Sequence, residues 1–223
     1  MKFVIRNDTY YVVAKKKIFL LVYLCCLLLV SFFLKSQTGN EYSFVKSVLG
    51  IWAGIDSNII AKIFLVYSFF VYIYLGYDLF LKDLRFSYGN IFSRLNKKTW
   101  VISKIISIFL ITWLIKIITY LLLFIIAGTN CGLYSYILNL LFTWFWQLLF
   151  LIGYIICFKS HIGKILVLFG SLILILVFSF FPQLLMSDFY SDFVLGILSV
   201  LLLGIYLIVS NKNINSIVER SLV

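Results

Sequence analysis

Histidine and glutamate are nearly absent from this 223-residue chain, which limits the chemistry it can carry out. The one histidine is His161, and the glutamates are Glu41 and Glu219, near opposite faces of the predicted membrane bundle. A metalloprotease inside a membrane needs histidine and carboxylate ligands at one depth, and a serine hydrolase needs a base beside its nucleophile. We therefore expect a chain that is not an enzyme, with no catalytic residue and no metal site.

Charge is also scarce, at 12% of residues, whereas 64% are hydrophobic and 19% aromatic. With a mean hydropathy of +1.11, this composition excludes a soluble globular domain. The four cysteines lack the spacing of a metal or redox motif. The net charge of +11 sits in short clusters at the ends of apolar runs. Membrane topology and anionic lipid explain such clusters better than nucleic acid does.

Six windows approach the roughly 20 apolar residues that a membrane helix needs. They cover residues 18–34, 59–77, 105–127, 134–157, 163–181 and 193–209. No convincing internal repeat divides the chain. The sequence thus predicts an all-α membrane protein in which residues 1–223 form a single domain of six transmembrane helices.

The basic residues predict the orientation, because Lys and Arg concentrate in cytoplasmic segments. With the N-terminus inside, fifteen of the 19 fall on the cytoplasmic side, Lys35, Lys46 and Lys62 fall outside, and Lys116 lies within the third window. We therefore expect both termini in the cytoplasm and a multi-pass protein of a bacterial plasma membrane.

Two basic segments stand out. Residues 1–17 end in three lysines and predict either an interfacial elbow on the cytoplasmic leaflet or a disordered basic tail. Residues 78–104 form a charged connector between the second and third windows. This connector holds the densest block of cations in the chain: Lys82, Arg85, Arg94, Lys97, Lys98 and Lys104.

Polar residues inside the windows form a third feature. Thr112, Lys116 and Tyr120 share one face of the third window, where a lipid-facing lysine would cost at least ~2.5–3.5 kcal/mol. In the fourth window a polar stripe recurs at spacings of three and four: Tyr136, Asn139, Thr143 and Gln147. These residues predict either a partly polar translocation path or helix packing through interhelical hydrogen bonds.

The connector contains the segment YGNIFSRLNKKTW, residues 88–100, followed by Ser103 and Lys104. With the basic segment before it and the six windows, this segment resembles the permease subunits of ABC type 2 exporters. The resemblance is strongest to short bacterial members linked to peptide or bacteriocin export and immunity. Many members have a glutamate shortly before the glycine, where this chain has Asp83 and Arg85.

The resemblance implies a coupling helix over about residues 83–95 that docks on a separate ABC ATPase dimer. Its contact residues would be Asp83, Arg85, Gly89, Ile91, Phe92 and Arg94. A second permease subunit, identical or related, would complete the transporter. No phosphate-binding loop of the GxxxxGK[ST] type occurs in the chain, so ATP and Mg²⁺ would bind only to the ATPase. The expected substrate is an amphipathic peptide or a lipid-like molecule.

Two alternatives stay open from the sequence. One is the substrate-binding membrane subunit of an energy-coupling-factor importer, which also has about six helices. The other is a membrane immunity protein that transports nothing, for which any basic loop would replace the connector.

Labelling of a single cysteine tests the predicted orientation. In a variant with the four native cysteines replaced by alanine, we expect Ser93→Cys to react with a membrane-impermeant maleimide only in inverted vesicles. Ser57→Cys, in the predicted first outer loop, is the control and should react in intact cells. Labelling of Ser93→Cys in intact cells would show that the predicted topology is wrong.

Overall fold

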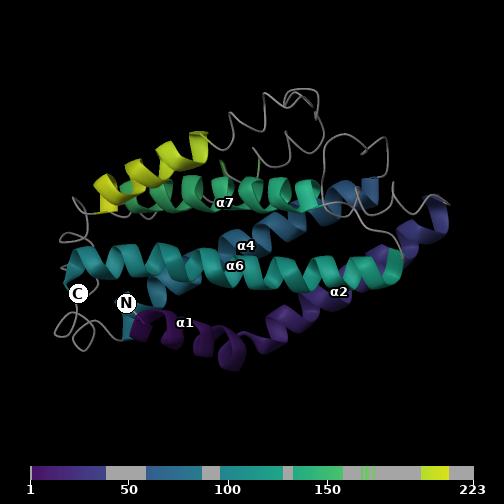
Figure 1. The fold of residues 1–223 in the computed structure, drawn as a ribbon, viewed down its shortest axis with the longest axis horizontal. Coiled ribbons are helices and arrows are strands. Elements are labelled where there is room, and N and C mark those ends of the chain that lie inside the picture. Colours follow the sequence, from purple (N-terminus) through teal and green to yellow (C-terminus); the bar gives the residue numbers. More distant parts are fainter. Residues whose placement is uncertain are drawn as a thin grey trace.

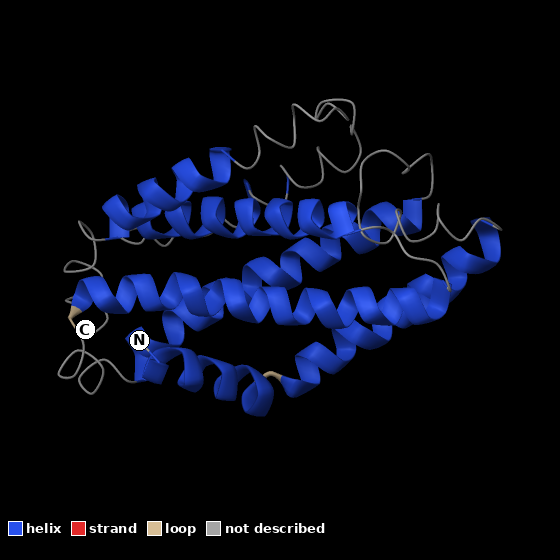
Figure 2. Ribbon diagram, viewed as in Figure 1, coloured by secondary structure: helices blue, strands red, loops and turns tan. Residues whose placement is uncertain are grey.

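A computed structural model describes residues 2–38, 59–86, 96–127, 133–157 and 197–210, together with positions 167, 169, 170 and 173. The labelled helices are α1 (Lys2–Lys15), α2 (Lys17–Thr38), α4 (Ile59–Phe86), α6 (Lys97–Ala127) and α7 (Leu133–Ile156). A shorter apolar helix covers Ile197–Ser210. The described residues contain no strand (Figure 2). The expected all-α class is confirmed for this part of the chain.

Among the described residues, three helices are long and apolar enough to cross a membrane: Lys17–Ser36, Lys98–Ile126 and Asn139–Ile156. They correspond to the first, third and fourth predicted windows, as expected for a membrane protein. The second window lies within α4, which has 28 residues. The fifth window, 163–181, lies almost entirely outside the described residues, so six membrane spans stay a prediction.

Both ends of the predicted connector, residues 78–104, are helical, and its cytoplasmic location stays a prediction. Residues 78–86 are the last part of α4, and residues 97–104 are the first part of α6, so only residues 87–96 lie between the two helices. No glycine or proline lies between Gly76 and Gly89, and the charges near the helix ends are paired inside the protein. A charged sequence therefore continues both helices instead of forming a loop.

Of the two alternatives for residues 1–17, the disordered tail is wrong, and the interfacial elbow stays a prediction. Residues 2–15 form α1, which buries one face through Val4, Asp8 and Val12. The chain bends at Lys16, and α2 then leaves at an angle to α1 (Figure 1). Helical backbone bonds continue through the bend, from Lys16 N to Val12 O at 3.1 Å and from Leu20 N to Lys16 O at 2.9 Å. The N-terminal segment is thus a helix that packs against the bundle.

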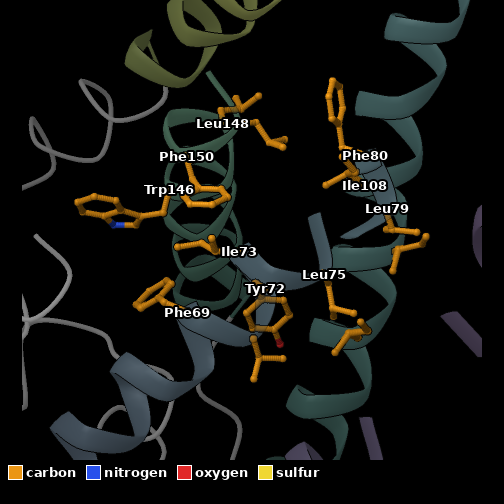
Figure 3. Close-up of a cluster of buried hydrophobic side chains, with 14 of the residues drawn as sticks. Phe69, Tyr72, Ile73, Leu75, Leu79, Phe80, Ile108, Trp146, Leu148 and Phe150 are labelled. Carbon is orange, nitrogen blue, oxygen red and sulfur yellow. The ribbon is translucent and has the colours of Figure 1, made fainter. Parts of the chain in front are cut away.

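The centre of the bundle lies where α4 crosses α6 and α7 (Figure 1). Buried apolar side chains from these three helices meet there (Figure 3), among them Phe69, Tyr72, Ile108 and Trp146. Gly76 of α4 faces both neighbours at this crossing, with space for a methyl group in ordinary van der Waals contact. A Cβ at this position would lie 3.5 Å from Ile108 Cγ2 and 3.8 Å from Gln147 Nε2. The same crossing brings the polar side chains of α6 and α7 together.

Candidate functional site

A buried carboxylate on α1 joins three helices. Asp8 is fully buried, and its Oδ1 lies 2.6 Å from Lys82 Nζ of α4 and 2.7 Å from Lys104 Nζ of α6. Its Oδ2 accepts hydrogen bonds from Lys104 Nζ at 2.9 Å and from the Ser107 hydroxyl at 2.7 Å. One carboxylate therefore contacts both helices that border the connector.

A second acid completes this group. Asp83 Oδ2 lies 2.8 Å from Lys104 Nζ and accepts a hydrogen bond from Trp100 Nε1 at 2.9 Å. Lys104 also donates to the carbonyl of Leu79 at 2.9 Å. We call the four charged residues Asp8, Lys82, Asp83 and Lys104 the acid–base cluster. Two carboxylates and two ammonium groups balance its charge.

Burial makes the pairing in this cluster mandatory. A buried charge without a partner is costly, and removing one member of a buried pair typically destabilises a protein by about 3–5 kcal/mol. Lys82 also donates to the carbonyl of Asn7 at 3.1 Å. Burial lowers the pKa of Lys82, while the charge and hydrogen bond of Asp8 oppose that shift. The cluster thus ties α1 to the end of α4 and the beginning of α6.

A smaller, partly exposed contact lies at the bend between α1 and α2. Lys16 Nζ lies 3.0 Å from Asp78 Oδ2 and donates to the Tyr74 hydroxyl at 3.2 Å. Burial opposes the positive charge of Lys16, but its hydrogen bonds to Asp78 and Tyr74 outweigh burial and raise its pKa. This contact fixes the bend against α4.

The cluster changes the interpretation of the predicted docking residues. Asp83 is 1% exposed and bonded within the chain, a position that does not suit contact with a partner protein. Arg85 lies at the end of α4, and its side chain is outside the described part. Gly89, Ile91, Phe92 and Arg94 also lie outside the described residues. Lys82 and Lys104, counted among the cations of the connector, are buried as well.

Asp8 is the site residue that sequence reasoning missed. It lies four residues after Val4 and four before Val12, so it falls on the apolar face of a helix. A carboxylate between two valines at this spacing indicates a buried acid that needs a cation. The three lysines at positions 15–17 instead favour a basic surface segment, so the two patterns in residues 1–17 disagree.

The predicted polar residues of α6 and α7 bond to one another at the centre of the bundle. The Thr112 hydroxyl donates to Gln147 Oε1 at 3.1 Å, and Gln147 Nε2 donates to the Tyr72 carbonyl of α4 at 2.8 Å. Lys116 Nζ donates to Asn139 Oδ1. We call Tyr72, Thr112, Lys116, Asn139 and Gln147 the polar layer. As expected, Lys116 faces other helices.

Aromatic rings surround this layer. Lys116 Nζ lies 4.5 Å from the centre of the Tyr72 ring and 5.8 Å from that of Phe69. The hydroxyls of Tyr72 and Tyr23 are 3.1 Å apart, which brings α2 into the same network. Tyr120 is half-buried, with its ring centre 5.2 Å from that of Tyr136.

These contacts favour the packing alternative for most of the predicted path. Thr112, Lys116, Asn139 and Gln147 are buried and joined across helices, whereas the Thr143 hydroxyl donates to the Asn139 carbonyl of its own helix. A translocation path along these residues stays a prediction.

Within the described residues, no three His, Cys, Asp or Glu side chains are grouped so that they could hold a metal ion. Cys25, Cys26 and Cys157 are free thiols. No family model, curated protein or solved structure matches this chain.

A pair of threonine variants tests the packing role of the polar layer. Thr112→Val removes a hydrogen bond between α6 and α7, so we expect the free energy of unfolding to fall by about 0.6 kcal/mol, the average for such bonds. Thr143→Val is the control, since it removes only a bond within α7, and should cost less. Unfolding in mixed SDS micelles measures both. Equal losses would contradict a packing role that depends on interhelical bonds.

Proposed function

We propose that this chain is the membrane-spanning permease subunit of an ATP-driven exporter of the ABC type 2 class. A separate ABC ATPase dimer would bind and hydrolyse ATP, and a second permease subunit, identical or related, would face this one. We also propose that the chain crosses a bacterial plasma membrane six times, with both termini in the cytoplasm.

The acid–base cluster is the observation that supports the proposal most. It lies at the base of residues 87–96 and joins the end of α4 to the beginning of α6 through Lys82, Asp83 and Lys104. Without it, a force on the connector would bend the two helix ends separately. With it, the force would move α4, α6 and α1 together.

The proposed docking surface for the ATPase accordingly contains one residue fewer than the sequence predicts. Asp83 becomes a positioning residue at the base of the connector, because its carboxylate is used by Lys104 and Trp100. Contact with the ATPase would fall to Arg85, Gly89, Ile91, Phe92 and Arg94. Closure of the ATPase dimer would push this segment and tilt the bundle, since packed helices move as units between discrete states.

The proposed substrate is an amphipathic peptide or a lipid-like molecule moved out of the cell. The interior that α4, α6 and α7 share contains a cluster of aromatic and aliphatic side chains (Figure 3) next to the polar layer. Such an interior suits a molecule with a large apolar part better than a sugar or an inorganic ion. The surrounding apolar surfaces, including Leu29 on α2 and Ile125 on α6, would face lipid or the second subunit.

Photo-crosslinking tests the proposed partner. A photoreactive amino acid at Phe92 should crosslink the chain, in native membranes, to a protein that binds ATP. The same amino acid at Leu29, which is 71% exposed on the apolar surface of α2, is the control and should not capture that protein. The Phe92→Ala, Arg94→Glu variant should then separate ATP hydrolysis from transport.

Two outcomes would count against the proposal. One is that the Phe92 position captures only lipid. The other is that the double variant couples ATP hydrolysis to transport as well as the unmodified protein does.

A further inference from the structure

Lys116 differs from the other buried or partly buried lysines that the structure describes. Lys16, Lys82 and Lys104 each lie within 3.0 Å of a carboxylate oxygen. The described carboxylates, Asp8, Asp78 and Asp83, take part in those pairs. Lys116 follows Lys104 by twelve residues on α6, about 18 Å along the axis at 1.5 Å per residue. It is thus a buried cation remote from every carboxylate in the described part of the chain.

The groups around Lys116 compensate its charge only in part. Its side chain is 5% exposed, and Asn139 Oδ1 accepts one of its three N–H donors. The rings of Tyr72 and Phe69 attract the ammonium through their faces. A neutral amide and two rings are weaker partners than the carboxylates that the other lysines contact. Two N–H donors therefore have no acceptor among the described residues.

The surroundings also indicate what would complete the site. An anionic group with two or more oxygens would accept the remaining donors and balance the charge. The rings of Tyr72 and Phe69 also place apolar surface beside the ammonium group, so the complementary molecule is an anion with a hydrocarbon tail. Thr112, which bonds to Gln147 of α7, lies one turn before Lys116 on α6.

We propose that Lys116, Asn139 and Tyr72 bind the anionic group, a carboxylate or a phosphate, of an amphipathic ligand. This inference rests on the proposed function, because that ligand would be the transported substrate or a lipid that occupies its path. Lys116 would supply the countercharge, Asn139 would hold the amine in place, and the Tyr72 ring would contact the first carbons of the tail.

Binding of matched ten-carbon probes tests the inference. The purified chain in dodecyl maltoside would be titrated with decanoate, decyl phosphate, decanol and decyltrimethylammonium, and the shift in the thermal unfolding midpoint would be followed. We expect the two anions to bind at least tenfold more tightly than decanol, and the cation more weakly still. A preference for decyl phosphate would indicate a lipid headgroup, and a preference for decanoate a carboxylate substrate. Either preference supports the site.

Three variants separate this site from general charge effects. Lys116→Met should abolish the preference for anions, Lys116→Arg should keep most of it, and Lys98→Met, at an exposed lysine at the start of α6, should leave it unchanged. Equal binding of decanoate and decanol by the unmodified chain would overturn the inference, even if a variant failed to fold. So would an unchanged anion preference in Lys116→Met. Crosslinking at Phe92 does not involve Lys116, so the two proposals can fail separately.

Discussion

The carboxylate of Asp8, held between the ammonium groups of Lys82 and Lys104, is the interaction on which the described arrangement depends. It lies on α1, whereas its partners lie on the two helices that enter and leave the connector. A buried ion pair of this kind does not add much stability compared with an apolar core. Removing one of its partners, however, strongly destabilises the protein, because the other charge is left buried and unpaired. The cluster thus specifies which helices meet, more than how stable the bundle is.

The few charged side chains that the described helices bury are not spread evenly through the bundle. The described helices place three acids and three lysines together at one end of the bundle: Asp8, Asp78 and Asp83 with Lys16, Lys82 and Lys104. The bundle centre instead uses amides, hydroxyls and aromatic rings around Lys116. One end is therefore fixed by balanced charge, and the centre is joined by weaker polar contacts. In the proposed transporter, the fixed end would receive the force and the centre would meet the substrate.

Hydropathy predicted the helices well but their ends poorly. Uninterrupted apolar runs indicated α2, α6 and α7, because membrane helices need long apolar stretches. Spacings of three and four placed Thr112 and Lys116 on one face, and Asn139 and Gln147 on another, and these faces meet. Periodicity is sufficient for such a prediction, since it depends only on helix geometry.

The ends of α4 and α6 could not be predicted in the same way. The charges of Lys82, Asp83 and Lys104 favour a water-exposed loop when the sequence is considered alone. In the structure they are buried, because a charge paired with a distant partner is compatible with a buried helix. That partner, Asp8, lies 74 residues before Lys82 in the chain. Pairing over such a separation is a property of the tertiary structure. Only the placement of Asp8 between Val4 and Val12 hinted at it.

The most direct test of the cluster is a double-mutant cycle between Asp8 and Lys82. Free energies of unfolding in mixed micelles would be measured for Asp8→Asn, Lys82→Met and the double variant, with Asp78→Asn as a partly exposed control. The account predicts a loss of about 3–5 kcal/mol for Asp8→Asn, much less for Asp78→Asn, and a partial recovery in the double variant, where Lys104 and Asp83 still balance. Equal losses for Asp8→Asn and Asp78→Asn, with strictly additive effects in the double variant, would contradict it.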